Sequence, residues 1–140
     1  MPPSRWMLSS VDVKIIHYTI MAQHNEMGKI GEEAARRYLV EQGYEILETN
    51  WRQGRLEADI IAYKDHTIVF VEVKTRRNDT FGAPEMFVNR KKQLSCIRLA
   101  NAYVLQNRRT EEVRFDIVTV LLNQTGCQVS HIPNAFTTVG

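Results

Sequence analysis

The sequence lacks several features that mark particular classes of protein. Its longest apolar runs are short, such as residues 68–71, and none approaches the roughly 20 residues of a transmembrane helix. Its 140 residues include only two cysteines, Cys96 and Cys127, and neither has the CxxC or CxxH spacing of a zinc site. We therefore expect a cytoplasmic protein with free thiols and no membrane association.

The beginning of the sequence also lacks the pattern of a secretion signal. Residues 1–20 have no basic start, no long apolar core and no small-residue cleavage site. Met21, followed by Ala22 and Gln23, reads as a more natural start, and we hypothesise that the native protein begins there. On this interpretation residues 1–21 are an extension, either disordered or outside the native start, and residues 22–140 form a single domain.

Basic residues are concentrated in one segment, although the net charge is only +2. The basic residues of this segment are Lys74, Arg76, Arg77, Arg90, Lys91, Lys92 and Arg98. Over the same stretch the acidic residues are Asp79 and Glu85. A local excess of positive charge suits a phosphate-binding surface, although a solvated helix face has the same composition.

The spacing of apolar residues predicts an α/β chain. The predicted elements are a helix over residues 28–42, strands over 44–51, 56–63 and 67–75, a helix over 89–107, a strand over 113–122 and an edge strand over 127–132. A turn at residues 64–66 should join two strands into a hairpin. The third strand, second helix and fourth strand should form a right-handed crossover between parallel strands.

Charged residues interrupt two neighbouring strands of this prediction. A charged group inside an apolar strand is costly unless it is paired or binds a metal ion. Glu72 and Lys74 are two residues apart and therefore project from the same face of their strand. Asp59 lies on the hairpin partner, as does Glu57, and we expect Asp59 to reach Glu72.

Two interpretations of this group remain open. Hard divalent ions such as Mg²⁺ or Mn²⁺ prefer oxygen ligands, so Asp59 and Glu72 could hold one, with Lys74 orienting water or stabilising charge on a phosphate. Alternatively, Lys74 forms an ion pair with Glu72 or Asp59 that only fixes the hairpin. We favour the metal site because Asp59 lies on the partner strand. Glu32 could add a third carboxylate, although the helix dipole also explains an acidic residue there.

An ordered set of short motifs resembles one bacterial family. The motifs are Gly28-x-x-Gly31-Glu32, Gly43-Tyr44, Asn50-Trp51-Arg52, Glu57-x-Asp59, residues 70–76 (FVEVKTR) and Arg114-Phe115-Asp116. They resemble the YraN-like proteins, a mostly uncharacterised group that is similar to Holliday-junction resolvases and other PD-(D/E)XK restriction-endonuclease-like proteins. The resemblance implies a restriction-endonuclease-like α/β sandwich, with a mixed central sheet flanked by helices, in a single nuclease-like domain.

The resemblance also implies roles for individual residues. It places Glu32, Asp59, Glu72 and Lys74 at the catalytic positions, with Asp59 and Glu72 as ligands of Mg²⁺ or Mn²⁺. Related nucleases place a supporting polar residue near the start of the second helix, and Gln93 or Lys91 is our candidate. The candidate nucleic-acid contacts are Arg76, Arg77, Arg90, Lys91 and Lys92.

The remaining polar residues carry weaker signals. Arg114 and Asp116 should pair with each other in a structural role, and Trp51 should be a core or rim aromatic. His66 and His131 are expected in loops or at strand ends, without metal-ligand spacing, and we assign them no role.

We therefore expect a nucleic-acid-binding protein with a divalent-metal-dependent endonuclease site. The resolvase similarity suggests branched or repair-intermediate DNA as the substrate, and a homodimer that matches a symmetric junction. The alternative is a non-catalytic DNA- or RNA-binding or scaffold protein that retains a nuclease fold. An RNA nuclease is a third possibility, but the sequence has no RNA-specific signature.

Overall fold

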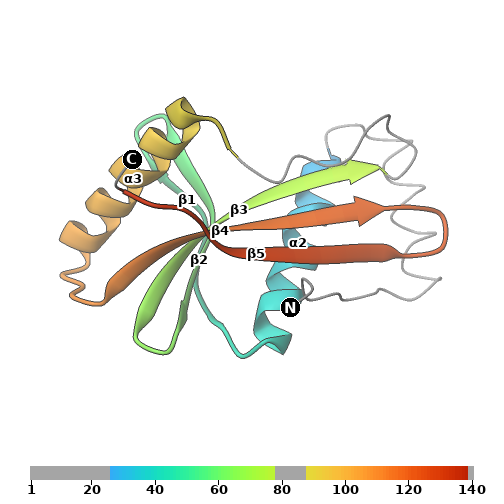
Figure 1. Ribbon diagram of the computed structural model, residues 1–140, viewed down its shortest axis with the longest axis horizontal. Helices are drawn as coiled ribbons and strands as arrows, with labels where there is room; N and C mark the ends of the chain where they lie inside the picture. The colour runs from blue at the N-terminus through green and yellow to red at the C-terminus, as the bar shows by residue number, and fades with distance from the viewer. Residues whose placement is uncertain (1–25, 78–87, 139–140) are drawn as a thin grey trace.

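A five-stranded sheet with one helix on each face makes up the part of the chain that the computed structural model describes, residues 26–77 and 88–138. Its elements are α2 (Glu26–Glu41), β1 (Glu45–Gln53), β2 (Leu56–Lys64), β3 (Thr67–Arg77), α3 (Arg90–Gln106), β4 (Glu112–Leu122) and β5 (Cys127–Phe136), as Figure 1 shows. The expected extension, the proposed start at Met21 and the loop expected at 78–84 lie outside the described residues.

The strands follow one another across the sheet in sequence order. β1–β2, β2–β3 and β4–β5 pair antiparallel, whereas β3 and β4 pair parallel, with α3 between them in the chain. A parallel neighbour requires such a crossover. The predicted α/β fold with a mixed sheet is confirmed and is consistent with a restriction-endonuclease-like sandwich.

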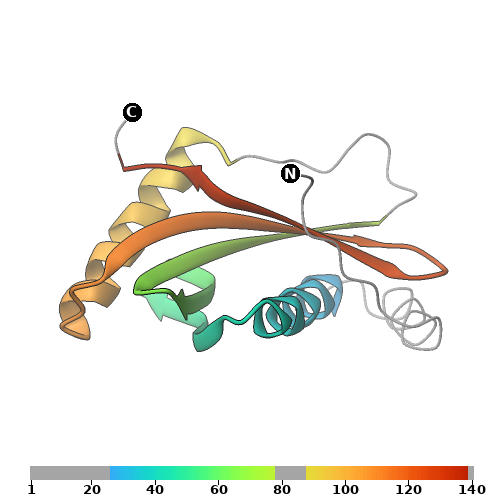
Figure 2. The ribbon, with the colours of Figure 1, turned by 60° about the horizontal axis from the view of Figure 1, so that its bottom comes forward.

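The two helices cover opposite faces of the sheet, as Figure 2 shows. Tyr38 and Leu39 of α2 pack in one apolar cluster with Val69 and Val71 of β3. On the other face, α3 packs with β2, β3 and β4 through a second cluster that contains Leu99, Ala100, Tyr103, Ile61, Phe70 and Phe115. β3 therefore buries side chains on both faces, as its nearly continuous apolar run predicts.

The β2–β3 hairpin fixes which residues face one another. Its two-residue turn, Asp65 and His66, has φ angles of 50° and 60°, the positive values of a type I′ turn. The paired residues of β2 and β3 begin with Lys64 opposite Thr67, next to the turn, and end with Ile60 opposite Val71. Asp59 and Glu72 come next in this register, so the two strands separate at the residues expected to bind metal.

A close contact between α2 and β3 sets the position of the helix. Gly31 is buried on α2, and a Cβ atom added there would overlap the Oγ1 atom of Thr75. Only a residue without a side chain allows the helix backbone to lie this close to β3. Because Glu32 follows Gly31 directly, this contact also determines where the Glu32 carboxylate lies.

Two sequence predictions need correction in the C-terminal part. β5 continues to Phe136, beyond the predicted end at residue 132, although it is an edge strand as expected. His131, expected in a loop or at a strand end, therefore lies inside β5, with its side chain only 8% exposed. Among the residues described, no helix is long and apolar enough to cross a membrane.

Candidate metal centre

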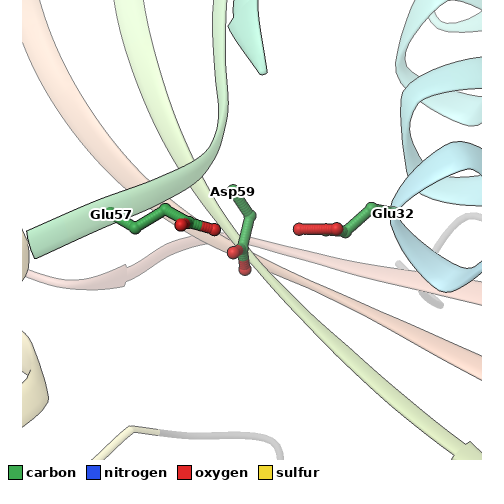
Figure 3. A group of neighbouring side chains, drawn as sticks. All are labelled: Glu32, Glu57 and Asp59. Carbon is green, nitrogen blue, oxygen red and sulfur yellow. The ribbon is translucent and has the colours of Figure 1, made fainter. Parts of the chain in front are cut away.

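Three carboxylates from two elements converge beside the end of the β2–β3 ladder. Glu32 projects from α2, and Glu57 and Asp59 project from β2, with one oxygen of each within 4.8 Å of the others. Figure 3 shows Glu32 and Glu57 pointing toward Asp59 from opposite sides. The expected meeting of Glu32 with Asp59 is thus present, and Glu57 joins them.

The separation of the strands gives Asp59 its position. Asp59 Oδ2 accepts a hydrogen bond of 2.8 Å from the backbone N–H of Val73. This N–H belongs to the part of β3 that lies beyond the β2 ladder, so the carboxylate takes the place of a strand carbonyl as its acceptor. The bond fixes one Asp59 oxygen against β3.

Asn50 of β1 holds two of the carboxylates together. It lies between Thr49, which pairs with Ile60, and Trp51, which pairs with Ala58, and therefore faces Asp59 across the β1–β2 hairpin. Its φ of 51° is in the left-handed region, which asparagine tolerates better than most residues. With its NH2 group turned to the acids, Asn50 donates to Glu32 Oε1 at 3.0 Å and to Glu57 Oε1 at 3.2 Å.

Crowding of negative charge changes the protonation of this group. Burial, together with the charges of Asp59 and Glu57, raises the pKa of Glu32 to about 7. Burial also raises the pKa of Asp59 above its usual range, against the effect of its bond from Val73. Glu57 makes an ion pair with Arg52, with 2.7 Å between Oε2 and Nε. A cation placed among these acids would relieve their repulsion.

Glu72 lies on the neighbouring strand, outside the group of three acids that the described residues bring within 4.8 Å. Its side chain is 17% exposed, and Lys92 Nζ of α3 lies 3.7 Å from its Oε1. Burial and the Asp59 charge raise the pKa of Glu72 to about 7, although Lys92 and, less strongly, Lys74 act in the opposite direction. The charges of Asp59 and Lys74 therefore both act on Glu72, in opposite directions.

Gln93, the predicted supporting residue, lies in the first turns of α3 and makes hydrogen bonds to the start of that helix. Asn89 caps the helix through a bond of 2.9 Å from Lys92 N, and Gln93 Nε2 donates to Val88 O. Gln93 Oε1 accepts from Arg90, so Gln93 braces the helix start. Lys92, a predicted nucleic-acid contact in the same turn, instead lies beside the Glu72 carboxylate. Lys91 is exposed.

The arginines at the end of β3 and the two cysteines lie outside the group of converging carboxylates. Arg76 and Arg77 are half-buried, and Arg76 donates to the carbonyl of Thr75. Cys96 and Cys127 are free thiols, with Cys127 fully buried. The donors that converge are thus carboxylate oxygens, a set that suits Mg²⁺ or Mn²⁺ and not a thiolate-bound ion.

A second polar group, away from the acids, braces α2 against β4 and β5. The fully buried carboxylate of Asp116 accepts two bonds of 2.8 Å from Arg114, confirming the expected pair. It also bonds His131 Nε2 at 2.7 Å and the backbone N–H of Asn134 at 2.9 Å. His131 Nδ1 lies 3.1 Å from the hydroxyl of Tyr38 on α2. His131 thus has a structural role that its sequence position did not reveal.

Comparison with known proteins identifies the family. A model described as "Uncharacterised protein family UPF0102" matches residues 31–120, a segment that contains Glu32, Asp59, Glu72 and Lys74. The chain belongs to the UPF0102 family. UPF0102 proteins from Bacteroides thetaiotaomicron and Christiangramia forsetii are 47% and 45% identical to it over 116 residues, which cover 83% of this chain and 96% and 98% of those proteins. A UPF0102 protein from Alkaliphilus oremlandii is 44% identical over 116 residues, covering 81% of this chain and 99% of that protein.

The sequence did not assign a role to two residues of this acidic group, Glu57 and Asn50. Glu57 lies two residues from Asp59 on the same strand face, but its sequence position alone gave no role for it. Asn50 stands in a recognised motif, and its contacts depend on a left-handed backbone that the sequence signals only weakly. An asparagine inside a strand, opposite an acidic residue on a hairpin partner, is the signal that could have identified it.

Proposed function

We propose that this UPF0102 protein is a divalent-metal-dependent endonuclease, with DNA as its substrate. One observation supports this above all others: the oxygens of Glu32, Glu57 and Asp59 come within 4.8 Å of one another where β2 and β3 separate, next to Glu72 and Lys74. Arg52 pairs with Glu57 here, but three like charges still converge around Asp59, which structural ion pairing does not explain. Such an arrangement costs free energy unless a cation or a proton compensates it.

Asp59, Glu32 and Glu57 are the residues that would hold Mg²⁺ or Mn²⁺, with Glu72 close enough to contribute electrostatically. When bound, such an ion supplies positive charge to a phosphate and lowers the pKa of a water. The donor set fits the ion because all its atoms are carboxylate oxygens.

The chain's own residues would then divide the remaining work. Asp59 is held by Val73 N, so one of its oxygens is fixed in place. Glu32 accepts a hydrogen bond from the Asn50 amide, so its carboxylate is held toward Asp59, where the ion would bind. Lys74, two residues beyond Glu72 on β3, would stabilise negative charge that develops on the phosphate.

Cleavage of a panel of labelled nucleic acids in Mg²⁺ or Mn²⁺ tests the proposal. The panel holds duplex, single-stranded, flapped and four-way DNA and an RNA of the same sequence. We expect cleavage of DNA, with flapped or four-way DNA preferred, and a loss on the order of 10²–10³-fold in D59N and E32Q. The control is E41Q, which removes one carboxylate from the exposed end of the same helix and should cleave like the wild type.

The same panel distinguishes the alternatives. If the wild type, D59N and E72A were all equally inactive on every substrate yet bound DNA, the chain would be a non-catalytic binding protein that retains a nuclease fold. Cleavage of RNA alone would identify the third possibility. A homodimer is part of the proposal for a four-way substrate, and sedimentation equilibrium should then give twice the monomer mass.

A further inference from the structure

The acidic group opens into a hollow between α2 and the β1–β2 hairpin. The hollow is lined on one side by Thr49, Asn50, Asp59 and Ile60, and on the other by α2. The helix side consists of Lys29, Glu32, Glu33 and Arg36. A substrate that reaches Glu32 and Asp59 from this side must therefore pass along the helix.

The four helix residues form a single stripe with an ordered charge pattern. Positions 29, 32, 33 and 36 have the i, i+3, i+4, i+7 spacing of one helix face. Lys29 lies one turn before Glu32 and Arg36 one turn after it, so two cations bracket the acids. Seven residues correspond to about 10.5 Å along the helix axis, and both side chains are long enough to extend this reach.

Lys29 and Arg36 can each give up a carboxylate partner and bind a phosphate in its place. Lys29 Nζ lies 3.6 Å from Glu26, with the Lys29 side chain 77% exposed. Arg36 makes two short bonds to Glu33, one turn away on the exposed surface. Exposed pairs of this spacing add little stability, and a guanidinium binds a phosphate with the same two-pronged geometry that it uses for a carboxylate.

We propose that Lys29 and Arg36 are positioning residues that hold the nucleic-acid backbone on either side of the phosphate at the acidic group. This inference rests on the proposed nuclease function and adds to it the path of the substrate strand, along α2 and through the hollow beside β1. Negative charge at Glu32, Glu57 and Asp59 repels a polyanion, and flanking cations offset that repulsion. The path also differs from the basic segment of β3 and α3 that the sequence suggested.

The test is the salt dependence of binding, measured by fluorescence anisotropy of a labelled single strand of about 20 nucleotides, which is long enough to extend past both cations. Ca²⁺, which takes oxygen ligands, replaces Mg²⁺, and the probe is checked for intact length afterwards. The variant K29Q/R36Q removes two positive charges. Its matched control, R108E, changes the net charge by the same amount at an exposed position just after α3, on a different element from the stripe.

We expect K29Q/R36Q to bind more weakly and to lower the slope of log affinity against log salt by about 1.4, because each phosphate contact on a single strand contributes about 0.7. R108E should keep the wild-type slope, and so should K29R/R36K, which retains both positive charges. E33Q, which removes the partner of Arg36, should bind about 1.5- to 5-fold more tightly than the wild type. Thermal unfolding of each variant checks that the fold is retained.

Two results overturn the inference in distinguishable ways. If the wild type cleaves and binds DNA but K29Q/R36Q has the slope and affinity of R108E, the strand takes another path and the nuclease proposal stands. If the wild type binds and cleaves no member of the nucleic-acid panel, both the path and the nuclease function are wrong.

Discussion

Replacing Gly31 with alanine tests the contact that positions Glu32. The new Cβ would overlap Thr75 Oγ1 and lie 2.8 Å from Thr75 Cβ and 2.9 Å from its Cγ2. Thr75 is buried on β3, a strand that pairs with β4 along its whole length. The sheet therefore cannot yield easily, and α2 must move away, carrying Glu32 with it.

The expected cost follows from two opposing effects. Overpacking a tight interface costs about 1–3 kcal/mol. Alanine is favoured over glycine inside a helix by roughly 0.5–1 kcal/mol, which offsets part of that cost. We expect a net loss of about 1–2 kcal/mol in the free energy of unfolding, or about 2–8 °C in Tm for a chain of this size.

Urea denaturation followed by circular dichroism measures the change, and Gly28 provides the control. A Cβ at Gly28 meets nothing within 4 Å, so G28A on the same helix should be neutral or stabilising by up to about 1 kcal/mol. In the double variant G31A/T75A, the overlap with Oγ1 and Cγ2 is removed and part of the loss should return. A G31A protein as stable as G28A, with unchanged Mn²⁺ affinity, would refute the claim that this contact positions Glu32.

Two further predictions concern protonation and the buried network. Because Glu32 and Glu72 have pKa values of about 7, Mn²⁺ must displace protons from them below that pH, and its affinity should fall more than tenfold from pH 8 to pH 6 by titration calorimetry. An Mn²⁺ affinity that does not change with pH would contradict the assignment of these carboxylates to the metal site. Because the folded protein raises the pKa values of these carboxyl groups, the metal-free protein should also lose stability as the pH rises from about 4.5 to 7. D116N removes the acceptor shared by Arg114 and His131 and should lower the free energy of unfolding by roughly 3 kcal/mol in urea; a loss below about 0.5 kcal/mol would show that this network does not brace the fold.

The arrangement of elements could be predicted because strong local signals agreed with one another. The apolar run of β3 indicated a strand covered on both faces, and the turn at Asp65 and His66 indicated the hairpin. A helix between two strands then implied parallel pairing, which the structure confirms. The strand β5 continues past its predicted end through Asn134, whose φ is 53° and whose backbone N–H bonds Asp116, a contact distant in sequence.

The site was harder to predict because it depends on where regular pairing stops. Strand alternation correctly placed Glu57 and Asp59 near each other, but it cannot show that the β2–β3 ladder ends before Asp59 and Glu72. The contact of Lys92 with Glu72 depends on how α3 packs over the sheet, which no local pattern encodes. His131 was overlooked because its partners, Asp116 and Tyr38, are distant in sequence.

The location of Mn²⁺ in crystals soaked with the ion tests the central claim most directly. Anomalous diffraction should show a peak within coordination distance of Asp59 and of at least one of Glu32, Glu57 and Glu72, and the peak should be lost in D59N crystals. No peak there, with the ammonium group of Lys74 or Lys92 lying between Asp59 and Glu72, would contradict the metal site and support an ion pair that only fixes the hairpin.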